Sequence, residues 1–298
     1  MAHVVPVVAS NALGIPWALF AFGAFATNDA IVKWVSAVLP VMQIAFVLTL
    51  GSLLPVMAVI WREGGFRDFW PSVPGLVALR ALFATTSALL AFSAFARLPL
   101  ADVYALIFTI PLWVTILSVP VLGEQVGWRR TSAVVVGFVG VLVMVRPGEA
   151  SLEVGHLMAA GCALCASSAY LVTRRIGGRA RGGTQLLAVS VAMLAVTAPS
   201  TLLAPPAAAP STFALLLAGG MLQGIAQFAI WQALKLSPAS VVVPFQYSQL
   251  LWAVVYGYLL FDAWPDRATL LGATIVIASG LYIMQRERRL GRQVRVVV

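Results

Sequence analysis

The side chains of this sequence that could do chemistry are polar groups set inside long apolar segments. Two stripes combine glutamine with tryptophan at helical spacing: Gln223, Gln227 and Trp231, and Gln246, Gln249 and Trp252. The members of each stripe share one helical face, and an amide that leaves water needs partners, so both faces are predicted to point inward. Hydrogen bonding between helices is one interpretation. The alternation of amides with indoles favours the other, a cavity that binds a polar solute with aromatic character.

Charged side chains also occur within the apolar segments. Asp29 and Lys33 are four residues apart, acid first, which places them on one helical face. They either neutralise each other near the outer interface or serve as a gate, a proton-coupling site or an anchor for an ammonium or carboxylate group. Asn28 lies deeper and is predicted to bind substrate. Arg80 lies about eight residues, roughly 12 Å, inside its segment. It either lines a central cavity and holds an anion, or snorkels and pairs with backbone carbonyls.

A row of Tyr104, Phe108 and Pro111 at i, i+4 and i+7 adds aromatic surface to the predicted site. Pro111 and Pro244 remove backbone hydrogen bonds inside apolar segments, which makes them candidate hinges. His156 lies at the outer start of its segment. It is either a proton-sensing gate, because histidine titrates near neutral pH, or a plain interfacial residue.

The elements that position these groups follow from the composition. Of the 298 residues, 61% are hydrophobic and 10% are charged, and the mean hydropathy is +0.97. A soluble domain carries roughly 25% charged residues, so this chain lacks the polar coat of a soluble enzyme. The same hydrophobicity excludes intrinsic disorder. The chain is therefore predicted to lie in a membrane.

Ten apolar windows are long enough to cross ~30 Å of hydrocarbon as helices. They lie near 12–34, 39–61, 72–95, 100–122, 128–146, 154–175, 183–204, 211–234, 238–261 and 267–285. Membrane β-strands would be half as long and would alternate in polarity. The expected fold is therefore an all-α membrane protein of ten transmembrane helices.

The basic residues of the loops orient these ten spans. With the N-terminus inside, fourteen Lys and Arg fall on the cytoplasmic side and four on the outer side. Cytoplasmic loops are enriched in such residues. The net charge of +9 thus records orientation rather than a nucleic-acid partner, and both termini of this multi-pass protein are predicted to be cytoplasmic.

An internal repeat relates the two halves of the chain. A shift of 138 residues aligns 95–131 with 233–269 without gaps and superimposes spans three to five on spans eight to ten. Seven of the thirty-seven pairs are identical. Because a five-span unit crosses the membrane an odd number of times, the second unit is inverted. We therefore expect two inverted five-helix repeats, 1–146 and 147–298, an architecture that recurs in secondary transporters.

Several function classes are disfavoured by what the sequence lacks. It contains no G-x-x-x-x-G-K-S/T motif for ATP, and its two histidines form no metal-ligand cluster. Paired carboxylates that would activate a nucleophile are missing from the spans. We predict no catalytic residues, no metal and no cofactor, and an energy source in an existing gradient or in exchange.

The pattern resembles the ten-helix EamA-type branch of the drug/metabolite transporter superfamily. The residues that carry the likeness are the run Ala88–Met144 with Pro111, Gly123-Glu124, Gly137 and Gly140, the second-half residues Gln249, Asp262 and Gly272, and Gly23, Lys33 and Pro40. An arginine often found in span two is absent, with Gln43 the nearest polar residue. In length and aromatic content the chain is most similar to bacterial amino-acid exporters, including the YddG-like exporters of aromatic amino acids.

The resemblance implies a secondary transporter of the inner membrane that exports amino acids or related small metabolites by alternating access. Spans one, three, four, six, eight and nine would line the cavity, with spans five and ten at the periphery. The expected partners are a small-molecule substrate and the lipid bilayer, and the expected state is a monomer or weak homo-oligomer. Efflux of organic cations is the alternative, and a membrane-embedded lipid-modifying enzyme is a remote third.

Overall fold

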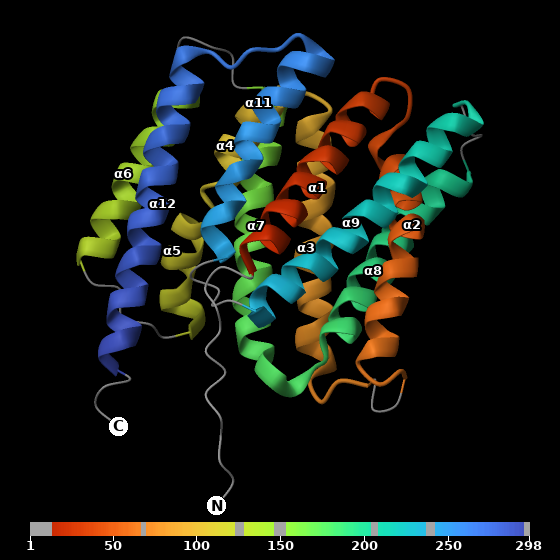
Figure 1. Cartoon of the computed structure of the whole chain (residues 1–298), viewed down its shortest axis with the longest axis horizontal. Helices are drawn as coiled ribbons and strands as arrows, with labels where there is room; N and C mark the ends of the chain where they lie inside the picture. Colours follow the sequence, from red (N-terminus) through yellow and green to blue (C-terminus); the bar gives the residue numbers. More distant parts are fainter. Residues whose placement is uncertain are drawn as a thin grey trace, which may run out of the picture.

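The chain folds as an all-α bundle in a computed structural model (Figure 1) that describes residues 14–66, 70–122, 128–145, 153–203, 208–236 and 242–294. Every regular element within these ranges is helical. The first half contains α1 (Gly14–Val35), α2 (Val41–Arg62), α3 (Pro74–Phe95), α4 (Leu100–Ile107), α5 (Ile110–Leu122) and α6 (Trp128–Val145). The second half contains α7 (Val154–Ile176), η1 (Gly177–Arg179), α8 (Gly182–Leu202), α9 (Pro210–Leu236), η2 (Val243–Tyr247), α11 (Ser248–Phe261) and α12 (Arg267–Val294).

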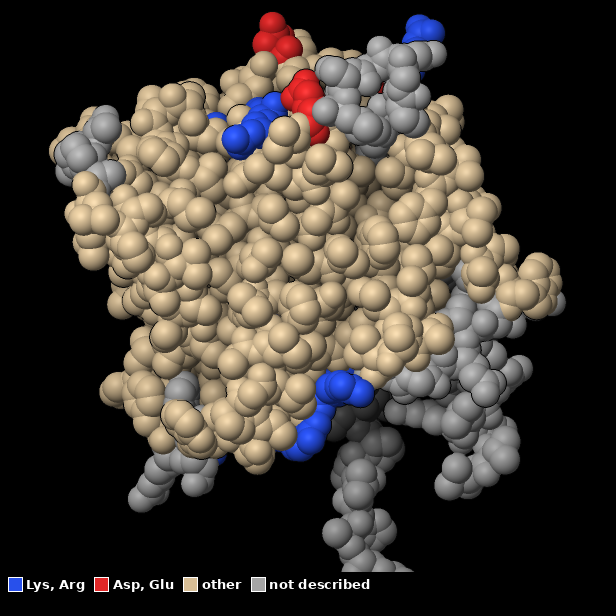
Figure 2. All heavy atoms as spheres, turned by 180° about the vertical axis from the view of Figure 1, so that it is seen from behind, with Lys and Arg blue, Asp and Glu red and all other residues tan. Residues whose placement is uncertain are grey.

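These elements correspond to the ten predicted spans. Seven segments of the described chain are long and apolar enough to cross a membrane, and α6 and α12 contain the shorter apolar stretches Thr131–Val143 and Arg267–Tyr282. On the face drawn in Figure 2 the charged side chains lie towards the two ends, with a broad uncharged band between them. Such a band is the surface expected against hydrocarbon. The chain is therefore a multi-pass membrane protein.

The span predicted over 100–122 is present as the apolar segment Leu100–Val121, and its helix is broken next to the predicted hinge Pro111. Helix α4 ends at Ile107 and α5 begins at Ile110, with Phe108 and Thr109 in a turn between them. Pro111 has no N–H to donate to the Ile107 carbonyl, which is the physical reason for a break at this point. The ninth span changes from the 3₁₀-helix η2 to the α-helix α11 at Ser248. This position corresponds to Ile110, the start of α5, in the 138-residue repeat.

The first helix of each half packs mainly against helices of the other half. Helix α1 packs against α9 and α11, and its counterpart α7 packs against α3, α4 and α5. Helices α2 and α8 contact each other on one side of the bundle, and α6 pairs with α12 on the other side (Figure 1). The largest core cluster draws on both halves, with Phe95, Tyr104 and Phe108 among its fully buried members. Exact boundaries of the repeats at 146 and 147 stay a prediction.

Candidate functional site

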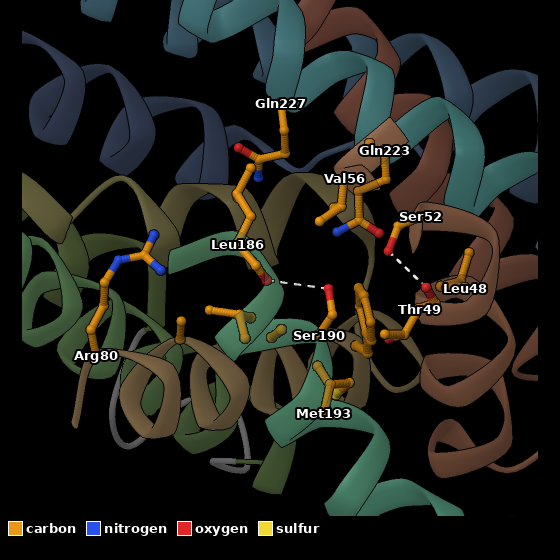
Figure 3. Close-up of a pocket in the computed structure, with 15 residues that line it drawn as sticks. Leu48, Thr49, Ser52, Val56, Arg80, Leu186, Ser190, Met193, Gln223 and Gln227 are labelled. Atoms are coloured by element: carbon orange, nitrogen blue, oxygen red, sulfur yellow. Dashed lines mark hydrogen bonds between the residues drawn. The ribbon is translucent and has the colours of Figure 1, made fainter. Parts of the chain in front are cut away.

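A cavity of about 220 Å³ lies where α2 and α3 of the first half meet α8 and α9 of the second (Figure 3). Its polar lining consists of Thr49, Ser52, Arg80, Ser190, Gln223 and Gln227. Its other lining residues are Leu48, Val56, Ala84, Ala88, Phe92, Leu186, Val189, Met193 and Gly224. The site is therefore built by the same pair of helices from each half.

Residue spacing explains how α3 lines one wall of this cavity. Arg80, Ala84, Ala88 and Phe92 follow one another at intervals of four, so they form a stripe along one helical face. The two alanines leave space in the middle of the stripe. As a result, the wall is charged near the start of α3 and aromatic near its end.

The guanidinium of Arg80 donates hydrogen bonds to two helices of the second half, α7 and α8. Its Nε donates to Thr173 Oγ1 of α7 at 2.9 Å, and its Nη1 donates to the Gln185 carbonyl of α8 at 3.1 Å. A guanidinium has five N–H donors, so three remain for a ligand. No carboxylate contacts Arg80 within the described chain. Both interpretations of Arg80 therefore hold in part: it lines the cavity and also donates to a backbone carbonyl.

The amides of Gln223 and Gln227 enter the cavity from α9 on the opposite side (Figure 3). Among the described residues neither amide has a hydrogen-bond partner. The hydroxyl protons of Ser52 and Ser190 are used within their own helices, since they donate to Thr49 O at 2.8 Å and to Leu186 O at 3.2 Å. Their oxygen lone pairs remain available as acceptors. Thr49 likewise donates to Ala45 O at 2.7 Å, so the cavity offers a cation, two free amides and three hydroxyl acceptors.

A second polar cluster lies outside this cavity, around Asp29. The Tyr104 hydroxyl donates to Asp29 Oδ2 at 2.5 Å. The Tyr104 ring stacks on Phe108, and Phe108 meets Tyr247 edge to face at 5.1 Å between ring centroids. Gln249 of α11 lies within hydrogen-bond reach of the same hydroxyl. These predicted residues therefore come together in the packed core rather than around the cavity.

Mutual neutralisation of Asp29 and Lys33, one of the two interpretations of their spacing, is wrong. Lys33 Nζ donates to the carbonyls of Phe95 at 3.1 Å and Leu98 at 2.8 Å, at the end of α3. Carbonyls at a helix C-terminus lack intrahelical partners and carry partial negative charge, so they attract the ammonium. Asp29 is left with the neutral hydroxyl of Tyr104.

The remaining predicted residues are dispersed. Asn28 is 1% exposed on α1, and its Oδ1 has no partner. Trp252 stacks on Tyr256 with 6.0 Å between ring centroids and is 40% exposed. His156 is partly buried at the start of α7, and its Nδ1 has no partner. Gln246 is partly buried in η2. The side chains of Trp231 and Pro244 lie outside what the structure describes.

Sequence reasoning missed the contribution of α2 and α8. The resemblance implied a cavity lined by spans one, three, four, six, eight and nine, whereas the cavity found in the structure is lined by spans two, three, seven and eight. The available signal was Ser52 and Ser190, two hydroxyls inside apolar spans. It is a weak signal, because a serine satisfies its proton on its own helix and so need not face a cavity.

Comparisons with known proteins agree on the class of protein. Residues 12–146 match the model of the EamA-like transporter family. The chain is 26% identical to the S-adenosylmethionine uptake transporter of Rickettsia bellii, over 93% of this chain and 95% of that protein. It is 28% identical to the riboflavin transporter of Vibrio cholerae, over 95% and 96% of the two chains. It is 25% identical to the pseudopaline exporter CntI of Pseudomonas aeruginosa, over 92% and 97%.

A solved crystal structure has the same fold, with a TM-score of 0.61 at 21% identity, over 92% of this chain and 96% of that one. Relatives and family domain alike are transporters and not enzymes. Residues 12–146 thus match an EamA-like domain, and the relatives that cover more than nine tenths of the chain are named as transporters, so the chain is similar to the EamA-type branch of the drug/metabolite transporter superfamily.

Proposed function

We propose that the chain is a secondary-active exporter of amino acids, especially aromatic or other apolar ones, and of related small metabolites. The proposed substrate site is the cavity between α2, α3, α8 and α9. The observation that carries the proposal is the guanidinium of Arg80, which faces this cavity with three donors unused and no carboxylate partner in the described chain. A guanidinium pairs with a carboxylate through parallel N–H···O bonds, and this makes it the residue of choice for such a group.

The rest of the lining suits the other parts of an amino acid. The amides of Gln223 and Gln227 offer oxygen acceptors to an ammonium group and N–H donors to a carboxylate. Phe92, Met193 and Leu48 add apolar surface to the lining, against which a side chain can pack. At about 220 Å³ the cavity is smaller than the roughly 300 Å³ at which drug-sized sites begin. A small metabolite is therefore the better match.

The relatives support this substrate class in part. S-adenosylmethionine, the substrate in the name of the Rickettsia bellii relative, carries an amino-acid head group, and the name of the Pseudomonas aeruginosa relative states export. Organic-cation efflux, the alternative, needs an acidic group at the site. None of the cavity's fifteen lining residues is acidic. We further propose that the protein lies in the inner membrane with both termini in the cytoplasm. Transport would occur as the two halves rock against each other and the chain flexes at Pro111 and Pro244.

Transport by purified protein in proteoliposomes tests the proposal. We expect uptake and exchange of radiolabelled phenylalanine or leucine, and Arg80→Ala should weaken apparent affinity by ~10- to 100-fold, since a charge-assisted hydrogen bond contributes about 1.5–3 kcal/mol. Arg80→Lys should retain part of the wild-type affinity, because lysine keeps the positive charge. The matched control is Arg97→Ala, because Arg97 is exposed in the turn after α3 and donates to Ser93 O at the end of that helix. Flux of an organic cation without flux of any amino acid, or unchanged affinity in Arg80→Ala, contradicts the proposal.

A further inference from the structure

Asp29 is a carboxylate inside a membrane helix with no cation to balance it. Its Oδ2 accepts a hydrogen bond from the Tyr104 hydroxyl at 2.5 Å, and Lys33, one turn further along α1, donates instead to the end of α3. No Lys, Arg or His contacts Asp29 among the residues that the structure describes. The flanking residues Asn28 and Ala30 are 1% and 3% exposed. The carboxyl group therefore lies at the edge of the packed core.

The groups around Asp29 cannot neutralise an ionised carboxylate. Besides Tyr104 of α4, the titratable side chains in its surroundings are Cys162 of α7, which lies within electrostatic range of Asp29, Tyr256 of α11, which bonds Thr27 at 2.8 Å, and Lys33 one turn along α1. No titratable side chain of α2 or α9 contacts it within the described ranges. Tyrosine and cysteine side chains carry no positive charge, and the cation Lys33 is bound to the carbonyls of Phe95 and Leu98 instead. A charge in such a place is costly, and binding of one proton removes it.

The same carboxylate is bound by Tyr104, close to the positions at which spans four and nine depart from a regular α-helix. Span four breaks at Phe108 and Thr109, and span nine changes from η2 to α11 after Tyr247. A shift of 138 residues superimposes Thr109 on Tyr247, and the Phe108 and Tyr247 rings are in contact at 5.1 Å. Tyr104 lies one turn before the first break. Discontinuous helices at the interface of inverted repeats are where transporters hold substrates and coupling ions.

We propose that Asp29 is the proton-binding site that couples proton movement to transport. The inference rests on the proposed function, since it concerns the energy source of the same transporter. One proton enters from water on one side, binds a carboxyl oxygen of Asp29 and leaves to water on the other side. The ionised form accepts a hydrogen bond from the Tyr104 hydroxyl and so ties α1 to α4. The neutral acid is a weaker acceptor and loosens that tie, so proton binding changes the contact between the broken span and α1.

A sodium ion would neutralise the same carboxylate, but the geometry favours a proton. The hydrogen-bond partner of Asp29 is a hydroxyl that points its hydrogen at the carboxylate. A hard cation instead needs several oxygen lone pairs directed at one point. Gradients of the two ions therefore discriminate between them.

Proton binding is measured first, without any substrate. Titration of the detergent-purified full chain across the neutral range should show about one proton fewer per chain in Asp29→Asn than in wild type. The control is Asp102→Asn, another partly buried acid of the first half, whose Oδ1 accepts a hydrogen bond from Thr269. Asp102→Asn should leave the Asp29 proton in place. Equal proton uptake by wild type and Asp29→Asn overturns the inference. Tyr104→Phe is the second variant, and it should shift the midpoint of the titration because it removes the hydrogen bond to Asp29.

Proteoliposomes then test coupling. An imposed pH gradient should drive labelled amino acid above its equilibrium distribution in wild type and in Asp102→Asn but at least tenfold less in Asp29→Asn. If wild type exchanges amino acid and no pH gradient drives it, or a sodium gradient does, this inference fails while the proposed function stands. If wild type exchanges no amino acid at all, the proposed function fails, and the titration still decides whether Asp29 binds a proton.

Discussion

Replacement of Gly220 by alanine tests how the cavity is sealed on one side. Gly220 of α9 lies against the backbone of α2, so that a Cβ built on it would overlap the Leu48 carbonyl oxygen and approach Leu48 Cα to 3.0 Å. A Cβ on Gly51 of α2 would likewise overlap the Leu217 carbonyl of α9. Small residues of this kind allow two membrane helices to approach closely. Leu48 lines the cavity, so this contact forms part of its wall.

The expected effect follows from what the new methyl group meets. Overpacking in a dense interior costs about 1–3 kcal/mol. The upper part of that range applies, because the obstacle is backbone and no side-chain rotation can relieve it. Alanine regains roughly 0.5–1 kcal/mol over glycine within a helix. The net loss should be about 1–2 kcal/mol, a factor of about 5–30 in the ratio of folded to unfolded protein.

Thermal unfolding of detergent-purified variants measures this. The matched control is Gly75→Ala near the start of α3, where a Cβ meets nothing within 4 Å. Gly75→Ala should melt at or slightly above the wild-type temperature, and Gly220→Ala should melt clearly below it. A Gly220→Ala variant that melts as high as Gly75→Ala would refute the close approach of α2 and α9.

Two further predictions concern contacts between spans. A Cβ on Gly280 of α12 would overlap the Tyr247 hydroxyl, so Gly280→Ala should lower the melting temperature and added Tyr247→Phe should restore it; failure of this rescue contradicts the contact. Lys33→Met should destabilise the protein by up to about 2 kcal/mol, the range for a partly buried cation at a helix C-terminus, and Lys33→Arg should retain most of the stability in the same melting assay. Equal melting of Lys33→Met and wild type would mean that the two carbonyls at the end of α3 need no cation.

Span number and class were predictable because they depend on composition and length alone. Arg80, Gln223 and Gln227 were predictable as inward-facing groups because polar side chains deep in a span rarely face lipid. The partners of Lys33 were not predictable, since spacing along α1 indicates Asp29, while the competing carbonyls lie at the end of α3 and just after it, 62 and 65 residues away. Sequence spacing predicts which side chains are neighbours on one helix, but it does not predict contacts with the end of another helix.

The glutamines of the second stripe show the same limit. The prediction that Gln249 faces inward is consistent with its burial, at 8% exposed. Its neighbour is the Tyr104 hydroxyl rather than the cavity, because the break between α4 and α5 brings α4 against α11. Pro111 predicts a weakened helix at this point, but the direction in which α4 turns depends on its packing against helices of the other half.

The two seams beside the cavity are equivalent in the repeat but are joined by different chemistry. Helix α9 packs more extensively against α2 than α3 packs against α8. Glycines seal the α2–α9 seam, whereas a hydrogen bond from Arg80 to the Gln185 carbonyl joins α3 to α8. A substrate carboxylate that binds the guanidinium competes with that carbonyl, because a charged acceptor forms the stronger bond. Substrate binding is therefore expected to loosen the α3–α8 seam while the α2–α9 seam stays closed, and the residue proposed to recognise the substrate would also control which seam opens.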